Sequence, residues 1–97
     1  MTTIGNGAFG ECYRLQKITI PNSVSSIGED AFWYCGYNQL FTLYCSRTTP
    51  PTLKGDIFGT SSGGEYVIYV PSSLVDKYKA ANIWKNYKGI IYRNPSM

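Results

Sequence analysis

The chain of 97 residues is long enough for one domain with a modest hydrophobic core, and a second domain is not expected. Its 43% hydrophobic and 15% charged residues are ordinary for a globular protein, and no apolar run approaches the roughly 18 residues of a membrane-spanning helix. The absence of histidine excludes the commonest general base, metal ligand and partner of a Ser or Cys nucleophile, so the composition argues against an enzyme.

The net charge of +3 is too small to indicate a nucleic-acid-binding protein. Five of the nine basic residues lie in the last quarter of the chain, where a solvated helix face accounts for them. They are Lys77, Lys79, Lys85, Lys88 and Arg93. The three cysteines form no C-x-x-C pair, so neither a disulfide framework nor a zinc site is expected. The first residues lack the basic and apolar regions of a secretory signal, so the sequence itself gives no indication of export.

A nine-residue motif opens the chain and then recurs. The pattern I-G-x-x-A-F-x-x-C occupies positions 4–12 and again positions 27–35. A shorter third copy, Leu53 with Ile57-Phe58, keeps the step of five residues from the aliphatic residue to Phe. A fixed period of this length predicts a repeat protein, whose units bury their apolar faces only by stacking.

A second pattern, L-x-x-L-x-L, follows each motif and is the signature of a leucine-rich repeat. Its copies, evenly spaced along the chain, are Leu15-x-x-Ile18-x-Ile20, Leu40-x-x-Leu43-x-Cys45 and Glu65-x-x-Ile68-x-Val70. The alternation predicts a short strand in each unit, and these strands should align in parallel about 4.8 Å apart. Extra residues at 36–38 and 59–64 are expected to form surface loops.

The motif itself is expected to form a helical turn with its apolar residues on one face. Ala8, Phe9 and Cys12 fall at positions i, i+1 and i+4, so they should point together into the core. Stacking of the units then predicts a core column of Phe9, Phe32 and Phe58.

The pattern changes after Pro71. Ser73 is expected to cap a helix whose apolar face holds Leu74, Tyr78 and Ala81, with lysines on the opposite side. Such an element would seal the last unit of the repeat. Further apolar residues, expected to pack behind it and end in a strand or an extended tail, are Trp84, Tyr87 and Ile90-Ile91-Tyr92.

Residues 4–53 resemble the BspA-like leucine-rich repeats, whose units read I-G-x-x-A-F-x-x-C-x-x-L-x-x-I-x-I-P. The tail is also similar to the terminal segment of that family, in Thr49-Pro50-Pro51, Val70-Pro71 and Tyr78-Lys79. The resemblance implies an α/β solenoid with short parallel strands, helical turns and a C-terminal capping helix. Residues 1–71 would form two and a half to three coils, and residues 72–97 the capping helix and tail.

The resemblance also implies an extracellular or cell-surface protein of host-associated bacteria. Proteins of this family are often adhesins that contact host extracellular proteins or neighbouring cells. A binding face is expected on the residues that alternate with the buried strand positions, on the concave side of the sheet. These candidates are Lys17, Thr19, Thr42, Tyr44, Val67 and Tyr69. Tyrosine suits contact surfaces because it is large, stiff and amphipathic, although it also simply favours strands.

Three other patterns have simpler explanations. Residues 5–10 match G-x-G-x-x-G, but no strand is expected before Gly5 and the later unit keeps only the first glycine, so no cofactor is expected. The adjacent carboxylates Glu29 and Asp30 are expected to lie in a solvated loop and not to form an acid–base pair or a cation site. Cys12 and Cys35 share one repeat position and should lie within disulfide range, although buried free thiols are the favoured interpretation.

Two functional hypotheses remain open. The first is a non-enzymatic module that binds a protein partner, and the second is a purely structural terminal cap of a longer solenoid with no ligand of its own. No strand or cap is expected to cover the first unit, whose core layer comprises Ile4, Phe9, Leu15, Ile18 and Ile20. Self-association through this N-terminal coil is therefore expected unless a further repeat covers it.

Overall fold

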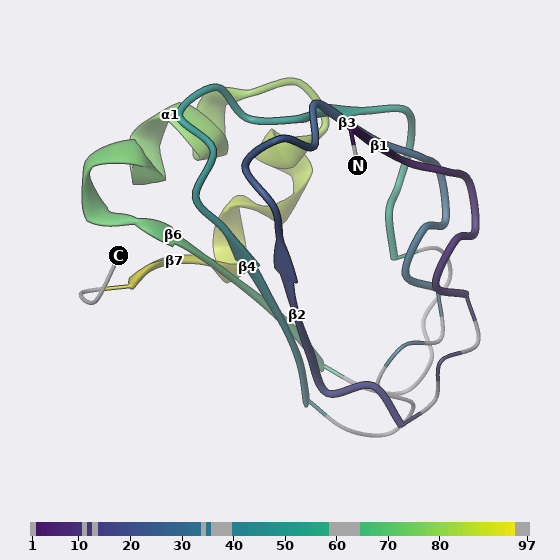
Figure 1. The fold of residues 1–97 in the computed structure, drawn as a ribbon. Helices are drawn as coiled ribbons and strands as arrows, with labels where there is room; N and C mark the ends of the chain where they lie inside the picture. Colours follow the sequence, from purple (N-terminus) through teal and green to yellow (C-terminus); the bar gives the residue numbers. More distant parts are fainter. Residues whose placement is uncertain are drawn as a thin grey trace.

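The structure is a computed structural model of the chain. It describes residues 2–10, 12, 14–33, 35, 40–58 and 65–94. The two predicted loop insertions, 36–38 and 59–64, lie outside this part. The chain alternates between two parallel sheets (Figure 1). The three-stranded sheet contains β1 (Thr3–Ile4), β3 (Ser26–Ile27) and β5 (Thr52–Leu53). The four-stranded sheet has the order β2 (Lys17–Ile20), β4 (Leu40–Cys45), β6 (Glu65–Pro71) and β7 (Ile91–Asn94).

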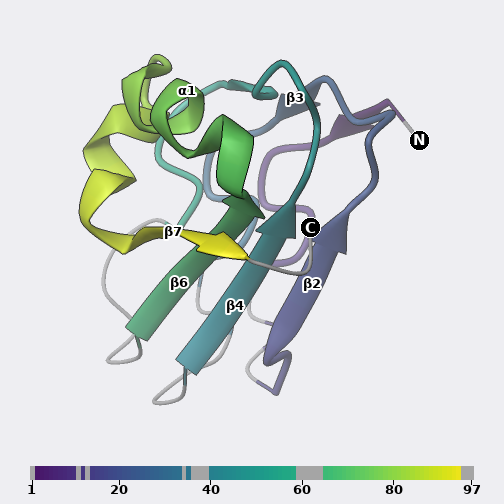
Figure 2. The same ribbon diagram turned by 90° about the vertical axis from the view of Figure 1, so that its left-hand side faces the viewer.

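Each passage from the first sheet to the second is here called a coil. Coil 1 runs from β1 to β2, coil 2 from β3 to β4 and coil 3 from β5 to β6. Figure 2 shows β2, β4 and β6 side by side, as the predicted parallel ladder requires. Ile18 pairs with Leu43, and Leu43 with Ile68, so the register predicted from the even spacing of the L-x-x-L-x-L copies is confirmed.

The three-stranded sheet explains the first residues of the repeated motif. Ile4 pairs with Ile27 and Ile27 with Leu53, which confirms that Leu53 begins a third copy. The sequence predicts no strands here, because two residues are too few to establish an alternating pattern. β1 also corrects the expectation that no strand precedes Gly5.

The strand β4 places Leu40, the first residue of its L-x-x-L-x-L copy, outside the core. Phe41, Leu43 and Cys45 are fully buried, whereas Leu40 remains 51% exposed. Side chains alternate along a strand, so two residues an odd number of positions apart point to opposite faces. Leu40 lies three residues before Leu43 within one continuous strand, and Phe41 therefore takes the core position.

The repeated motif forms consecutive turns and not the predicted helical turn. In coil 1 the backbone N–H of Cys12 donates to the Phe9 carbonyl at 3.3 Å, and in coil 2 that of Cys35 donates to the Phe32 carbonyl at 3.1 Å. Both copies of the motif also contain a residue with positive φ before these turns, Gly7 at 63° and Asp30 at 57°. A left-handed residue interrupts a right-handed helix, so the motif curves around the core as a series of turns.

The same motif is less buried in coil 1 than in coil 2. Ala31 and Phe32 are fully buried, whereas Ala8 is exposed and Phe9 is only partly buried. Coil 2 has a neighbour on both sides, but among the described residues coil 1 has a neighbour only on the coil 2 side. Self-association through this partly apolar edge stays a prediction.

An aromatic column crosses the core, but its members differ from those predicted. Phe9 and Phe32 stack with ring centroids 5.6 Å apart and planes 8° apart. Phe41 contacts both of the remaining phenylalanines, with ring centroids 5.9 Å from Phe32 and 6.4 Å from Phe58. Phe58 instead stacks on Tyr66 at 4.2 Å. The predicted column therefore continues through the strand residue Phe41.

After β6 the chain forms short helices beside coil 3, at the opposite end of the strand row from β2 (Figure 2). They are η1 (Ser72–Leu74), α1 (Val75–Ala80) and η2 (Trp84–Ile90). The predicted Ser73 cap is wrong, because the 3₁₀ turn begins directly after Pro71 and includes Ser73. α1 starts after Leu74 without a side-chain cap, and its buried side chain is Tyr78, as the helical pattern predicts. The predicted last strand is β7, which pairs in parallel with β6.

We expect Phe32→Ala to lower the free energy of unfolding by about 3–5 kcal/mol. Phe32 is fully buried between Phe9 and Phe41, so truncation leaves a cavity that the stacked coils cannot close. Urea titration would measure the loss. Phe9→Ala is the matched control, and its cost should be clearly smaller because Phe9 is partly exposed. A cost for Phe32→Ala under about 1 kcal/mol would contradict the central place given to this ring.

Candidate protein-binding face

The outer face of the four-stranded sheet brings the six candidate residues into two columns. Lys17, Thr42 and Val67 are aligned by strand pairing, and a second column contains Thr19, Tyr44 and Tyr69. All six are exposed or partly exposed, because they alternate with buried positions of β2, β4 and β6. These six residues are called the outer face below. Protein binding by the outer face stays a prediction.

Three tyrosines form a continuous ladder across this face. The rings of Tyr44 and Tyr69 stack at 5.6 Å with planes 20° apart. Tyr92 on β7 pairs with Tyr69 and extends the ladder, with ring centroids 6.3 Å apart. The aligned strands hold the rings in this stack, so their faces cover one another.

Sequence reasoning missed two exposed residues beside the outer face. Tyr92 is 49% exposed, and Leu40 and Tyr92 are the large apolar or aromatic side chains most exposed in the described part of the chain. The sequence spacing could have indicated Tyr92, because Tyr92 follows Tyr69 at the same spacing at which Ile27 follows Ile4. Leu40 is the first residue of its L-x-x-L-x-L copy, and its exposure adds an apolar group beside Thr42.

The ionisable groups with altered acidity lie in the interior and not on the outer face. Burial raises the pKa of the Cys35 thiol to about 12, and burial likewise raises the pKa of Cys45, Tyr78 and Tyr87. A raised pKa keeps a thiol or phenol protonated at neutral pH, whereas nucleophilic catalysis requires the ionised form. These groups therefore act as hydrogen-bonding core residues.

The G-x-G-x-x-G match and the Glu29-Asp30 pair lie in turns next to the three-stranded sheet. The G-x-G-x-x-G match follows β1 directly, but consecutive turns and no helix follow it in the described part of coil 1. Glu29 is exposed, and its backbone N–H donates to the side-chain oxygen of Asn6 at 2.9 Å. Within the described ranges, no cluster of three or more His, Cys, Asp or Glu residues could hold a metal ion. None of the helices described is long and apolar enough to cross a membrane.

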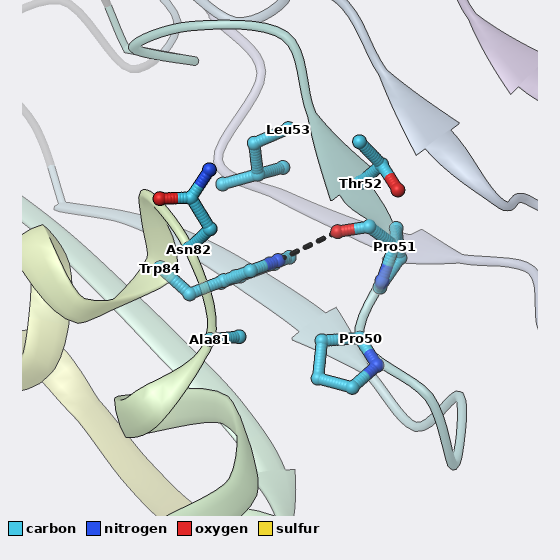
Figure 3. A pocket seen from close by; sticks show the side chains of 7 residues that line it. All are labelled: Pro50, Pro51, Thr52, Leu53, Ala81, Asn82 and Trp84. Carbon is cyan, nitrogen blue, oxygen red and sulfur yellow. Dashed lines mark hydrogen bonds between the residues drawn. The ribbon is translucent and has the colours of Figure 1, made fainter.

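Three aromatic side chains of the C-terminal segment contact coil 3 and the connection that leads into it. Between coils, the Ser25 N–H donates to the Thr2 carbonyl at 2.8 Å, and the Thr52 N–H donates to the Ser25 carbonyl at 2.9 Å. Pro51 holds the equivalent position in coil 3, and its carbonyl accepts the indole N–H of Trp84 at 2.8 Å (Figure 3). A small pocket of about 130 Å³ adjoins this bond.

Two tyrosines complete this contact. The backbone N–H of Ile57 donates to the Tyr87 hydroxyl at 2.9 Å. This hydroxyl in turn donates to the Asp56 carboxylate. The Tyr78 hydroxyl donates to the Arg47 carbonyl at 2.6 Å. Of these backbone groups, the Pro51 carbonyl is the one whose equivalent in coil 2, the Ser25 carbonyl, accepts from the next coil.

We expect the double variant Tyr44→Ser/Tyr69→Ser to stay folded, with a cost below about 2.5 kcal/mol. Both side chains point away from the core, so the variant loses mainly their mutual stacking. Circular dichroism and a cooperative urea transition would verify this. Complete unfolding would mean that the inward and outward positions of β4 and β6 are reversed.

Comparison with known proteins gives a family match. The model described as BspA type Leucine rich repeat region (6 copies) matches residues 1–54, which span coils 1 and 2 and the start of coil 3. No curated protein matches the chain. Because the family match covers more than half of the 97 residues, the chain belongs to the BspA-type leucine-rich-repeat family.

Proposed function

We propose that the chain is a non-enzymatic adhesion module of a bacterial cell-surface or secreted protein. It binds a host extracellular protein or a protein of a neighbouring cell through the outer face. Leucine-rich repeats of this family are protein-interaction modules and generally lack catalysis. The observation that carries the proposal is the register of Tyr44, Tyr69 and Tyr92 on the exposed side of the four-stranded sheet.

The composition of this surface supports protein binding. Aromatic side chains with hydroxyl groups contribute large contact areas at low entropic cost and still form hydrogen bonds to a partner. The stacked rings of Tyr44 and Tyr69 are already ordered before binding, so a partner does not have to immobilise them. Their neighbours Thr19 and Thr42 are small and polar, which suits the rim of an interface.

Binding of the labelled chain to immobilised extracellular-matrix proteins and to intact host and bacterial cells would test this function. We expect saturable binding to at least one of these surfaces, and at least a tenfold weaker affinity for Tyr44→Ser/Tyr69→Ser. Tenfold corresponds to about 1.4 kcal/mol, a moderate loss for two aromatic contact residues.

Lys54→Ser is the matched control, because Lys54 is exposed but lies beside the three-stranded sheet. Its affinity should equal that of the unchanged chain. Binding that survives the double tyrosine variant would refute the outer face as the contact, and absence of binding to every surface would refute the adhesion function.

The second candidate, favoured by the contacts of residues 72–94, is a structural terminal cap. A coil at the end of a stack leaves backbone donors and acceptors without partners, and an open edge invites association. The indole of Trp84 bonds to such a group, the Pro51 carbonyl, and the hydroxyls of Tyr78 and Tyr87 bond to further backbone groups beside it. In this interpretation the helices end the stack, and they remain compatible with a binding face on β2, β4 and β6.

We expect Tyr78→Phe and Tyr87→Phe each to lower the free energy of unfolding by about 1–3 kcal/mol. The change keeps the ring but removes the hydroxyl, so the Arg47 carbonyl or the Ile57 N–H loses its partner. Tyr92→Phe is the matched control and should cost less than about 0.5 kcal/mol, because its hydroxyl is exposed and makes a long bond of 3.4 Å. Thermal and urea unfolding would measure all three. Equal costs for the three variants would contradict the capping interpretation.

A further inference from the structure

Cys12 and Cys35 are equivalent residues of neighbouring coils. Each lies three residues after a core phenylalanine, and each closes the same turn through its backbone N–H, at 3.3 Å in coil 1 and 3.1 Å in coil 2. The phenylalanine rings before them stack 5.6 Å apart with planes only 8° apart. The two turns are therefore nearly parallel copies, displaced by about one coil spacing of ~4.8 Å. That displacement falls within the Cα separation of about 4.4–6.8 Å that a disulfide bridges.

The side chain of Cys35 reaches across to coil 1. Its thiol donates to the Phe9 carbonyl oxygen at 3.0 Å. The backbone N–H of Cys12 donates to the same oxygen. One carbonyl thus contacts both the Cys35 sulfur and the Cys12 backbone. The neighbouring Cys12 also contributes, after burial, to the raised pKa of Cys35.

The three cysteines differ in access to solvent. Cys12 is partly exposed, whereas Cys35 and Cys45 are buried. Cys45 lies on β4 and not in a motif turn, and its sulfur contacts the Tyr78 hydroxyl at 3.3 Å. In the sequence of the third copy, the residue three positions after Phe58 is Ser61, whereas the first two copies have cysteine at that position. The pattern therefore offers one accessible thiol with one buried neighbour.

We propose that Cys12 and Cys35 form a thiol modification site at which a small-molecule disulfide, such as oxidised glutathione, creates a bond between coils 1 and 2. The Cys12 thiolate attacks one glutathione sulfur, forming a mixed disulfide and releasing one glutathione thiolate. Cys35 then loses its proton to water and its sulfur attacks the Cys12 sulfur, releasing the second glutathione thiolate. Two protein thiols are oxidised to one disulfide, and one oxidised glutathione is reduced to two thiols.

The rate of ring closure by Cys35 should depend on pH. Because the pKa of Cys35 is raised to about 12, only a small fraction of this thiol is ionised near pH 7. That fraction grows about tenfold for each pH unit below the pKa, so ring closure should accelerate with rising pH.

The test is incubation of the folded chain with oxidised glutathione, followed by intact-mass measurement, thiol counting and peptide mapping. We expect the free thiols to fall from three to one, the mass to fall by about 2 Da, and one peptide pair to join Cys12 to Cys35. The oxidised chain should melt at least about 5 °C higher, and a thiol reductant should reverse the change.

Two matched variants separate the steps. Cys35→Ser should accumulate glutathione on Cys12 as a stable adduct, because no resolving thiol is present. Cys12→Ser should take up neither glutathione nor a disulfide while folded, because both remaining thiols are buried. Cys45→Ser keeps the proposed pair, and its oxidation to the same Cys12–Cys35 bond should be detectable by peptide mapping.

Several outcomes would overturn the proposal. Three unreacted thiols in the folded chain after prolonged exposure would show that the pair does not close. A disulfide that includes Cys45, or one that joins two chains, would show that the coils do not hold Cys12 and Cys35 together. A glutathione adduct that persists at Cys12 in the unchanged chain, even at high pH, would show that Cys35 cannot resolve it.

Discussion

The hydrogen-bond ladder between successive coils is the constraint on which the rest of this structure depends. Each strand of a parallel sheet presents unpaired N–H and C=O groups to the next one, and these groups are costly to bury without partners. The ladder fixes which residue of one coil lies over which residue of the next, as in the pairing of Ile18 with Leu43 and Leu43 with Ile68. Packing inside and the column order outside both follow from this register.

A ladder of this kind must end somewhere, and coil 3 ends in an unusual way. The Pro51 carbonyl, which a fourth coil would contact, accepts the indole N–H of Trp84, and the hydroxyls of Tyr78 and Tyr87 bond to nearby backbone groups. Aromatic side chains suit this position because one end is apolar and packs on the core, while the other forms a hydrogen bond. Tyr78 and Trp84 also contact each other edge to face at 5.1 Å. The short segment after β6 is thus held to coil 3 by aromatic packing together with side-chain hydrogen bonds.

The sequence predicted those features that the period determines. The constant spacing of the L-x-x-L-x-L copies suffices to align β2, β4 and β6, and therefore to place Thr19, Tyr44 and Tyr69 in one column. Features set by local strand phase were harder to predict. The L-x-x-L-x-L signature treats Leu40 as a core residue, but a straight strand turns it outward and buries Phe41. The family pattern does not reveal where the strand starts, so the phase of its first residue remained undetermined.

Features outside the repeat depended on tertiary contacts. Ser73 fits the sequence pattern of a helix cap, yet the 3₁₀ turn after Pro71 includes it. The bonds that hold Trp84 and Tyr87 join residues far apart in the sequence, and no local pattern encodes them. The strand β7 was partly predictable. It follows β6 at the same sequence spacing that separates the first two motifs, but the residues between β6 and β7 do not match the repeat.

The ladder also explains where the repeat tolerates changes in length. The step from Ile18 to Leu43 is longer than the step from Ile4 to Ile27, and both ladders still pair in register. The extra residues enter between the motif and the strand, where no ladder is shifted. An insertion of one residue within β4 would act differently, because it would exchange the two faces of the strand. Tyr44 would enter the core and Cys45 would leave its contact with Tyr78. The outer face therefore depends on strand phase more strictly than on the length of the repeat.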